Sequence, residues 1–474
     1  MTLDLKKFFQ ATSPGKTLFV DNNQEDHKYY IDFSSVRGGR IIEELKDNIT
    51  LWHRDEAYCQ LFTGHIGCGK STELLLLKAQ LETEGFHVVY FDSSQDLEMG
   101  DVDVSDILLA IARRVSESFD HLANSQPKTI QDVIKQVSRL LQTEIELTAD
   151  AEVPGMGKIS ANSQGKFEVE VGIPGIGKIS FDQKEGVSLV APLIGKINAK
   201  TKASPDLRGK LRGYLEPRTS GILEAINQEL LAPGISQLKE LGKKGLVVIV
   251  DSLDKIDNIP KPWGRSQQEY LFVDRGEQLR SLNCHVVYTM PLGLRFSNDF
   301  NTLKQRFLTT PFVLPMVSLK LKDGSQCEAG MELLRQMILA RAFPYLTEAE
   351  RLTKIGEIFD HEETFNYLCL MSGGHVRQLL RLLNDSLKKQ KGLPISRETL
   401  EMVITVDCNE QRLGVDQHEW QLLRAVFQEK KVAGDQEYQT LIRSMFVYEY
   451  HQSEKSESWF DVNPILATAK ELQP

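Results

Sequence analysis

Cysteine and long apolar runs are scarce in this sequence, and each scarcity excludes a class of protein. The 474 residues include 6 cysteines, with no C-x-x-C pair and no spacing typical of metal ligands. Scattered cysteines indicate a reducing compartment rather than a disulfide framework. No window approaches the roughly 20 apolar residues of a membrane-spanning helix, and the N-terminal MTLDLKKFFQ lacks the apolar core of a signal peptide. We therefore expect a cytoplasmic protein with no membrane span.

Basic charge is also in short supply. The 66 acidic residues outnumber the 56 Lys and Arg, which gives a formal net charge of −10. Proteins dedicated to nucleic acid are usually basic, so this balance argues against that class, although a local basic patch is not excluded. Hydrophobic residues make up 41% of the chain and charged residues 26%, which is ordinary globular usage. The length leaves room for two or three domains.

Residues 64–71 read GHIGCGKS and match G-x-x-x-x-G-K-[ST] at every position. The glycines let the backbone curl so that successive N–H groups point at a phosphate chain. Lys70 adds a mobile positive charge for the β- and γ-phosphates, and the Ser71 hydroxyl is suited to bind Mg²⁺. The pattern predicts a site for ATP and Mg²⁺. Its contacting residues are Gly64, His65, Ile66, Gly67, Cys68, Gly69, Lys70, Ser71 and Thr72.

The flanks of this loop support the match. Residues 58–63 predict a buried strand and residues 71–84 a helix, whose N-terminus would present its positive dipole end to the phosphates. A second stretch, GIPGIGK at 172–178, is close to the same pattern. There Ile179 replaces the Ser or Thr, and no helix follows, so we reject it as a second nucleotide site.

From about 56 to 320 short apolar strands alternate with helices, which predicts an α/β fold with a parallel, doubly wound sheet. Strands covered on both faces should be apolar and β-branched, as these are. The strands expected after the first are 87–92, 246–250, 284–289 and 312–317. We therefore predict a P-loop NTPase core over 51–320, preceded by a lead-in over 1–50. A helix is expected at 41–52, with Ile41, Ile42, Leu45, Ile49 and Leu51 on one apolar stripe.

Residues 151–213 interrupt the pattern of the core. Three related segments, VPGMGKIS, IPGIGKIS and APLIGKIN, recur there, and KFEVEV between them alternates strictly. We predict a β-rich insertion of hairpins with Pro-Gly turns. It holds ten Lys or Arg against six Asp or Glu. This excess favours a contact surface for a protein partner, for nucleic acid or for acidic lipid heads; the alternative is a decorated insertion with a solvated face.

The remainder of the chain turns helical. We expect a helical lid subdomain over 321–412 and a winged-helix-like domain over 413–474. The expected lid helices are 329–342, 348–359, 375–389 and 397–408. The expected C-terminal elements are helices 418–428 and 436–444 and strands 445–450 and 459–462.

Two carboxylates follow the strand at 246–250. Asp251 ends that strand at the edge where ligands bind in open α/β sheets, so it would hold the Mg²⁺ shell together with Ser71. Asp254, three residues on, would orient or deprotonate the attacking water. The structural alternatives are a strand-ending turn and an ordinary acidic turn.

Three further residues are candidates for catalysis. Thr289 ends the next strand, where its hydroxyl would sense the γ-phosphate through water. Arg377, in SGGHVR, projects from the start of a lid helix, and a guanidinium suits phosphate oxygens. Arg306 would reach a neighbour's ATP as an arginine finger if the protein forms rings or filaments. The structural alternatives are an ordinary strand-end threonine for Thr289, a surface arginine for Arg377 and a solvated helix charge for Arg306.

In this order the motifs resemble the AAA+ and STAND groups of P-loop ATPases, in the ASCE division. GHIGCGKST is similar to Walker A, LVVIVDSLD to Walker B, VVYT to sensor 1 and SGGHVR to sensor 2, over about 35–410. RGGR at 37–40 resembles the segment that contacts adenine in origin-recognition-type and transposition-type members. AAA+ motors carry Glu directly after the Walker B Asp, whereas here that position is Ser252. The D-S-L-D arrangement is more similar to STAND switches, and the resemblance implies slow hydrolysis and ATP-held oligomerisation.

The sequence thus favours a slow Mg²⁺-dependent ATPase that acts as a nucleotide-controlled switch in signalling or defence. We expect it to form a homo-oligomer on ATP binding and to meet a protein partner through 151–213. The alternative is a DNA-associated AAA+ ATPase similar to origin-recognition or transposition regulators. A third class is a scaffold that keeps ATP as a structural ligand.

Overall fold

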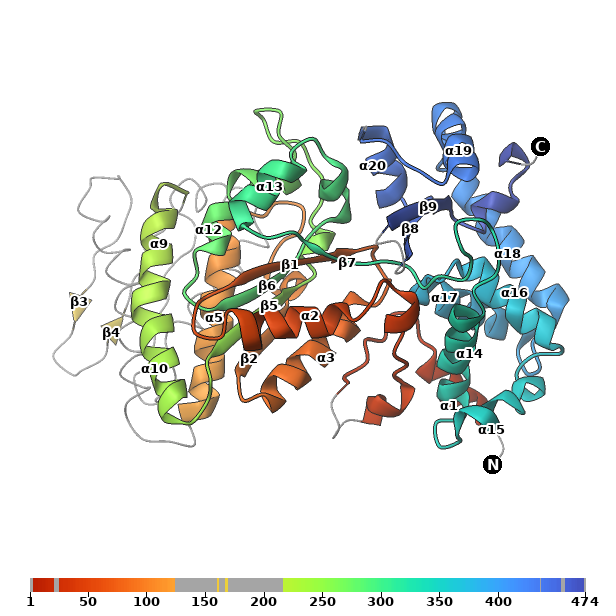
Figure 1. The fold of residues 1–474 in the computed structure, drawn as a ribbon, viewed down its shortest axis with the longest axis horizontal. Helices are drawn as coiled ribbons and strands as arrows, with labels where there is room; N and C mark the ends of the chain where they lie inside the picture. Colours follow the sequence, from red (N-terminus) through yellow and green to blue (C-terminus); the bar gives the residue numbers. More distant parts are fainter. Residues whose placement is uncertain are drawn as a thin grey trace.

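The centre of the molecule is a five-stranded parallel sheet in the order β2-β5-β6-β1-β7 (Figure 1). The structure is a computed structural model that describes residues 3–20, 25–123, 160–161, 167–168, 216–434, 436–452 and 457–472. The strands are β1 (Cys59–Gly64), β2 (His87–Asp92), β5 (Leu246–Asp251), β6 (His285–Thr289) and β7 (Phe312–Leu314). Four of them begin and end within a residue or so of the expected positions.

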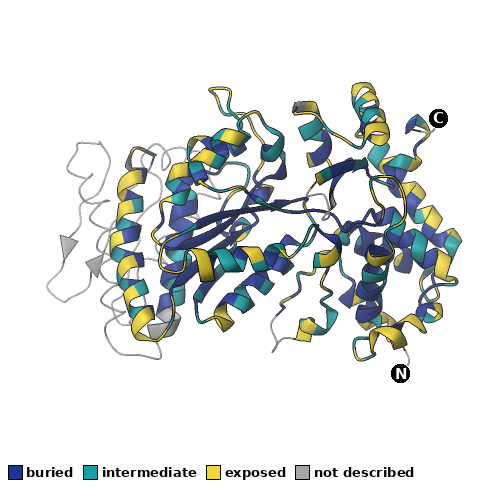
Figure 2. Cartoon of the chain, viewed as in Figure 1, coloured by how far each residue is buried: buried dark blue, intermediate teal, exposed yellow. Residues whose placement is uncertain are grey.

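Helices cover both faces of the sheet, so β1, β5 and β6 are buried along their length, whereas β2 and β7 are partly exposed (Figure 2). In β5, Val248 and Val250 enter one core, whereas Val247 and Ile249 enter the opposite one. One face packs against α5 (Val104–Ala123). The apolar core on that side also includes α9 (Thr219–Ala225), α10 (Ala232–Glu240), α12 (Gly276–Arg280) and α13 (Phe300–Phe307). The other face packs against α2 (Ile41–Asp47) and α3 (Lys70–Thr83). This is the doubly wound α/β fold that the alternating pattern predicts.

Shorter helical segments connect these elements. They are η1 (Glu25–Tyr29), η2 (Ser34–Val36), η3 (Asn48–Trp52), α4 (Ser93–Asp96), η4 (Glu216–Arg218), η5 (Ile226–Leu231), η6 (Leu253–Lys255), α11 (Gln267–Glu269), η7 (Tyr270–Asp274) and η8 (Leu292–Phe296).

A helical lid follows the sheet and has its own apolar core. It comprises α14 (Glu328–Ala342), α15 (Glu348–Leu352), η9 (Ile355–Glu357), α16 (Glu362–Ser372), α17 (Val376–Gln390) and α18 (Arg397–Arg412). The first helix of the chain, α1 (Leu5–Ala11), packs on α14 and belongs to the same core. Arg341 donates to the Ala11 carbonyl (3.2 Å), and Asn384 donates to the Thr12 carbonyl (2.7 Å). The expected lead-in is therefore divided between lid and sheet core.

The C-terminal residues form two helices and an antiparallel hairpin. They are α19 (Gln417–Glu429), α20 (Gln436–Arg443), β8 (Val447–Gln452) and β9 (Glu457–Val462), then η11 (Leu466–Thr468) and η12 (Lys470–Leu472). The hairpin does not stand apart as a separate wing. Tyr450 and Trp459 stack at 4.5 Å and join the core under the sheet, and Met316 N–H donates to the Glu449 carbonyl (3.0 Å). The hairpin thus fills the seam between sheet and lid (Figure 1).

Three local expectations are wrong. Leu51 does not join the buried stripe of α2, because it lies at the end of η3 and is 66% exposed. β7 ends at Leu314 rather than 317, since Pro315 has no N–H to continue the ladder. Residues 348–359 are not one helix, because α15 ends at Leu352 and Gly356 follows, a residue that costs about 1 kcal/mol inside a helix.

Most of the expected β-rich insertion, 151–213, lies outside the described residues. The described part is one antiparallel pair, β3 (Ser160–Ala161) and β4 (Phe167–Glu168). Among the described residues no helix is both long and apolar enough to span a bilayer.

Candidate nucleotide-binding site

The loop between β1 and α3 has the backbone that phosphate binding requires. Gly67 and Gly69 have φ angles of +87° and +111°, which residues other than glycine rarely adopt. A Cβ on Gly67 would lie 2.9 Å from His375 and 3.0 Å from Arg377. Gly69 is the N-cap of α3, so the N-terminal amides of that helix face the loop. These glycines are needed for backbone shape and for close approach of the lid.

Lys70 is held inside the loop. Its Nζ lies 2.9 Å from Asp254 Oδ2 and donates to the carbonyl oxygens of Gly64 (2.8 Å) and His65 (2.9 Å). Burial by itself lowers the pKa of Lys70, but the neighbouring Asp254, Cys68 and Asp251 together outweigh burial, and the pKa is raised. The ammonium therefore stays charged, and phosphate oxygens would have to replace these partners.

Ser71 and Asp251 come together at the sheet edge, as a Mg²⁺ site requires. The Ser71 hydroxyl hydrogen-bonds to Asp251, which also accepts from Tyr90 OH (2.7 Å) and Ser252 N–H (2.6 Å). Burial raises the pKa of Asp251, which is 2% exposed. A hydroxyl and a carboxylate are the hard oxygen ligands that Mg²⁺ uses beside substrate phosphates. Among the described residues no cluster of three or more His, Cys, Asp or Glu forms a metal site of its own.

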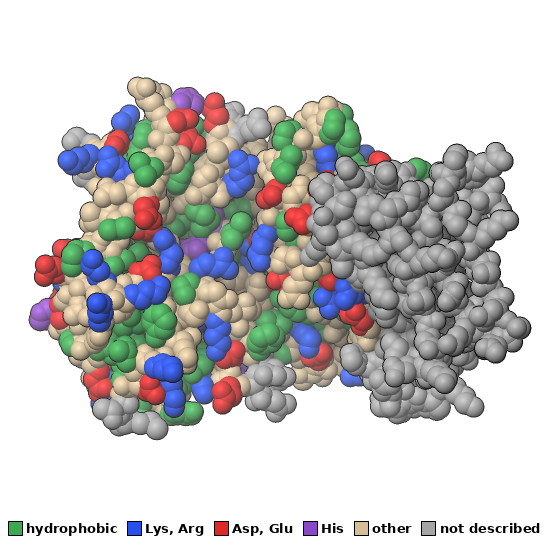
Figure 3. Space-filling model, turned by 180° about the vertical axis from the view of Figure 1, so that it is seen from behind, with side chains coloured by type: hydrophobic (Ala, Val, Ile, Leu, Met, Phe, Trp, Pro, Cys, Tyr) green, Lys and Arg blue, Asp and Glu red, His purple; other side chains and the backbone are tan. Residues whose placement is uncertain are grey.

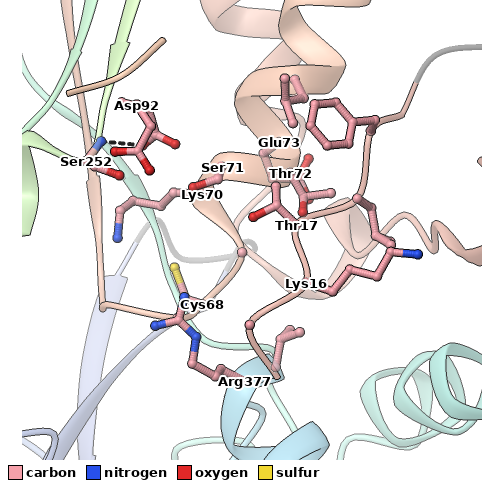
Figure 4. Close-up of a pocket in the computed structure, with 18 of the residues that line it drawn as sticks. Lys16, Thr17, Cys68, Lys70, Ser71, Thr72, Glu73, Asp92, Ser252 and Arg377 are labelled. Atoms are coloured by element: carbon pink, nitrogen blue, oxygen red, sulfur yellow. Dashed lines mark hydrogen bonds between the residues drawn. The ribbon is translucent and has the colours of Figure 1, made fainter. Parts of the chain in front are cut away.

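A cavity of about 490 Å³ opens beside the loop, within the usual range for small-molecule sites. Its polar end holds Lys70, Ser71 and the carboxylates, and Arg377 approaches from the lid (Figure 4). Much of its remaining lining comes from residues 14–19, 29–31 and 33 and from the lid helices α14 and α17. Apolar side chains there suit a flat base. They are Leu18, Ile31, Phe33, Met337, Val376 and Leu380.

Arg37 reaches the loop from the segment before β1. It is 3% exposed, donates to the Cys68 carbonyl and lies 4.0 Å from Glu73. Its Nε has no partner among the described residues. Tyr30 OH donates to Glu73 (3.2 Å). Burial raises the pKa of Glu73, although the nearby Arg37 acts in the opposite direction. Arg37 therefore adds a positive charge beside the loop, at the Cys68 carbonyl.

The lid contacts the loop through backbone carbonyls. His375 Nδ1 accepts from Gln378 N–H (2.9 Å) and caps α17, so its Nε2–H donates to the Ile66 carbonyl (2.8 Å). Arg377 N–H donates to the Gly67 carbonyl (3.2 Å). Burial lowers the pKa of His375 to about 4, so the ring stays neutral.

The C-terminal hairpin contacts the opposite side of the same loop. His65 Nε2 accepts the N–H of Glu449 (3.0 Å), and burial lowers the pKa of His65. The Tyr448 ring lies 5.8 Å from the rings of both His65 and His375. Tyr450 OH donates to the Gly373 carbonyl (2.7 Å) at the start of the lid turn. Loop, lid and hairpin thus form one contact network.

Two predicted catalytic residues are not brought to the cavity. Thr289 is fully buried, and its Oγ1 accepts Leu253 N–H (2.9 Å), so it fixes the turn after β5 instead of facing a phosphate. Arg306 lines no part of this cavity and pairs with Glu277 at 2.5 Å. Its side chain is 43% exposed, as a residue that acted on another subunit would be.

Several lining residues were missed by the sequence analysis. Asp92 and Tyr90 belong to β2, and a polar residue ending a strand at the ligand edge was an available signal. Arg37 lies in RGGR, which only the resemblance had marked. Residues 14–19 carry no motif, and nothing in the sequence placed them at the cavity.

Fold and site together have the architecture of a P-loop α/β fold: a parallel sheet with the candidate phosphate loop after β1, the second strand from one edge, an aspartate ending β5, and a helical lid whose arginine lines the same cavity. The ORC2 protein of Aeropyrum pernix, solved as ADPNP–ADP complexes, is similar at 10% identity and a TM-score of 0.40, over 100% of this chain and 97% of that one. Cdc6p of Pyrobaculum aerophilum is similar at 12% identity and a TM-score of 0.36, over 98% and 96%. No protein-family model matches the chain, and no curated protein matches it either.

Proposed function

We propose that this chain binds ATP with Mg²⁺, hydrolyses it slowly, and works as a nucleotide-controlled conformational switch. In this proposal the loop amides, Lys70 and Arg377 contact the phosphates, and Ser71 and Asp251 hold Mg²⁺. The metal would neutralise charge on the phosphates. The base would lie against the apolar lining from the N-terminal segment and the lid.

The observation that carries the switch is the contact of both lid and hairpin with the phosphate loop. The carbonyls of Ile66 and Gly67 accept from the lid, and His65 accepts from the hairpin. A triphosphate that displaces Lys70 from its carbonyl and carboxylate partners changes the loop that both units touch. The binding energy of the nucleotide is then available to shift lid and hairpin.

Nucleotide binding is tested first, by calorimetry with ATP, with ADP and with a slowly hydrolysed analogue. The wild type should bind each with Mg²⁺, and Lys70→Ala should lose binding. Sizing with the same nucleotides then tests the switch, for which we expect a larger species with ATP than with ADP. An unchanged size and unchanged protease sensitivity in all three states would contradict it.

Self-assembly and partner binding extend this proposal. Arg306 would act in trans in an assembly, and residues 151–213 would provide a partner surface. Arg306→Ala should then hydrolyse ATP normally at low protein concentration and lose only the stimulation that appears on assembly. Loss of activity at every concentration would contradict a role in trans.

Association with DNA is the second candidate, favoured by the order α19, α20 and hairpin, which is that of a winged helix. Other observations weigh against it. Tyr448, Glu449 and Trp459 of the hairpin are at most 3% exposed, and Gln439 of α20 donates to the Phe296 carbonyl. On the face shown in Figure 3 basic and acidic side chains interleave over the described surface. Binding that weakens steeply with salt would favour this candidate.

A further inference from the structure

Three carboxylates line the phosphate end of the cavity: Asp92, Asp251 and Asp254. The sequence analysis assigned the metal to Asp251 and the attacking water to Asp254. The three carboxylates differ in their contacts and in their exposure, and these differences indicate a different role for each.

Asp251 and Asp254 are both engaged and both buried, at 2% and 8% exposure. Asp251 accepts from Ser71, Tyr90 and Ser252, which fits a carboxylate held for a metal shell. Asp254 faces the ammonium of Lys70 at 2.9 Å. Asp254 is therefore turned towards the lysine of the loop, where its carboxylate serves as the counter-ion of that side chain.

Asp92 is placed differently. It ends β2 beside β5 and is the direct register partner of Asp251, so the two strand ends lie side by side at the ligand edge. Its side chain is 31% exposed, and Figure 4 shows it on the same side of the loop as Ser252 and Lys70.

The hydrogen bonds of Asp92 hold it in one orientation. Oδ1 accepts from the N–H (2.9 Å) and hydroxyl (2.6 Å) of Ser94, and Lys255 lies 4.0 Å from Oδ2. Burial alone would raise the pKa of Asp92, but these bonds and one from the Ser252 hydroxyl lower it. The carboxylate is therefore ionised at neutral pH.

We infer that Asp92, rather than Asp254, accepts the proton of the water that attacks ATP. This rests on the proposed function. The water oxygen forms a bond to the γ-phosphorus while the bond from that phosphorus to the bridging oxygen breaks, and its electron pair leaves with ADP. The water's proton passes to Asp92 and from there to solvent. Asp92 thus takes the role that a glutamate at the position of Ser252 has in the resembling motors.

The test is Asp92→Asn, since asparagine caps α4 as well as aspartate but cannot accept this proton. We expect ATP affinity within a few-fold of wild type and hydrolysis reduced about 100-fold or more. Nucleotide that stays on the protein after incubation and gel filtration should be ATP in the variant and ADP in the wild type. Asp92→Glu, which keeps a carboxylate, should recover part of the rate.

Two controls separate catalysis from capping. Ser94→Ala removes a hydrogen bond to Asp92 but keeps the carboxylate, so hydrolysis should remain within about tenfold of wild type, far above Asp92→Asn. Asp254→Asn should change nucleotide affinity and still turn ATP over. The inference is overturned if Asp92→Asn hydrolyses ATP at the wild-type rate, or if Asp254→Asn is the variant that retains ATP. A wild type that takes up no nucleotide in calorimetry overturns the proposed function as well, and is recognised before hydrolysis is measured.

Discussion

Lys70 and Asp254 form a buried ion pair, with Nζ 2.9 Å from Oδ2 and both side chains 5% exposed. The phosphate loop therefore holds an internal counter-ion for its lysine. A nucleotide must compete with this carboxylate, and its own phosphates must compensate the charge of Lys70. The pair links the stability of the loop to occupancy of the cavity.

Removing Asp254 should destabilise the nucleotide-free protein. Asp254→Ala leaves a buried ammonium unpaired, which typically costs about 3–5 kcal/mol. Thermal unfolding should show this loss, and ATP should restore more stability to the variant than to wild type. The double variant with Lys70→Ala should be more stable than Asp254→Ala alone. Equal melting temperatures of Asp254→Ala and wild type without nucleotide would show that the pair does not hold the loop.

Arg37 should contribute to nucleotide affinity. Arg37→Ala removes a buried charge that donates to the Cys68 carbonyl inside the loop, so we expect affinity to fall about tenfold, which is about 1.4 kcal/mol. Arg40→Ala is the matched control, because Arg40 belongs to the same RGGR segment but its side chain is 74% exposed and pairs with Glu43. Calorimetry of the two variants decides: an equal effect of both would exclude a specific role for Arg37.

The hairpin should influence a cavity that it does not line. Tyr448→Ala removes the ring that lies 5.8 Å from both His65 and His375, and deleting a buried aromatic ring costs about 3–5 kcal/mol. We expect weaker nucleotide binding at temperatures where the variant is still folded. Phe427→Ala, at a residue of α19 that is 41% exposed, is the control and should bind as wild type does. If the folded Tyr448→Ala variant bound nucleotide with wild-type affinity, the hairpin would have no influence on the loop.

Acid should destabilise the loop–lid contact through His375. Its folded pKa of about 4 lies below the usual 6.5, so the unfolded chain binds more protons between these values. The stabilisation is therefore complete above pH 6.5 and is lost as the pH falls towards 4, by about 3 kcal/mol in all. Denaturant unfolding across this range should show the loss, and His375→Asn, which can still cap α17, should reduce the slope without abolishing it, because burial also lowers the pKa of His65 and of His285.

The surface residue His418 is the control for this pH dependence. Its hydrogen bond to Glu437 raises its pKa, so His418→Asn removes a contribution present at low pH and cannot flatten the curve. A wild-type curve without any slope between pH 4 and 6.5 would contradict the neutral, buried His375.

Local patterns were enough to predict the sheet and the loop, because both depend on neighbours in the chain. The apolar run before Asp251 predicts β5, and the loop glycines predict a backbone that few other residues can adopt. Contacts across long separations left no such signal. Residues 14–19 reach the cavity because α1 docks on the lid, and Glu449 reaches His65 across 384 positions. Thr289 illustrates the same limit: its position was predicted, but its bond to Leu253 depends on how η6 turns.

Tyr450 and Trp459 cover one side of the sheet, although they belong to the C-terminal part of the chain. A fragment cut at the expected boundary near 413 would uncover the apolar side chains of Phe62 and Leu314 and delete the acceptor of Met316 N–H. Such a fragment should aggregate or unfold, however complete its motifs. The smallest unit that would hold a nucleotide therefore includes segments that lie far apart along the chain. A truncated fragment would be inactive because it is unfolded, and its inactivity would not identify residues that contact the nucleotide.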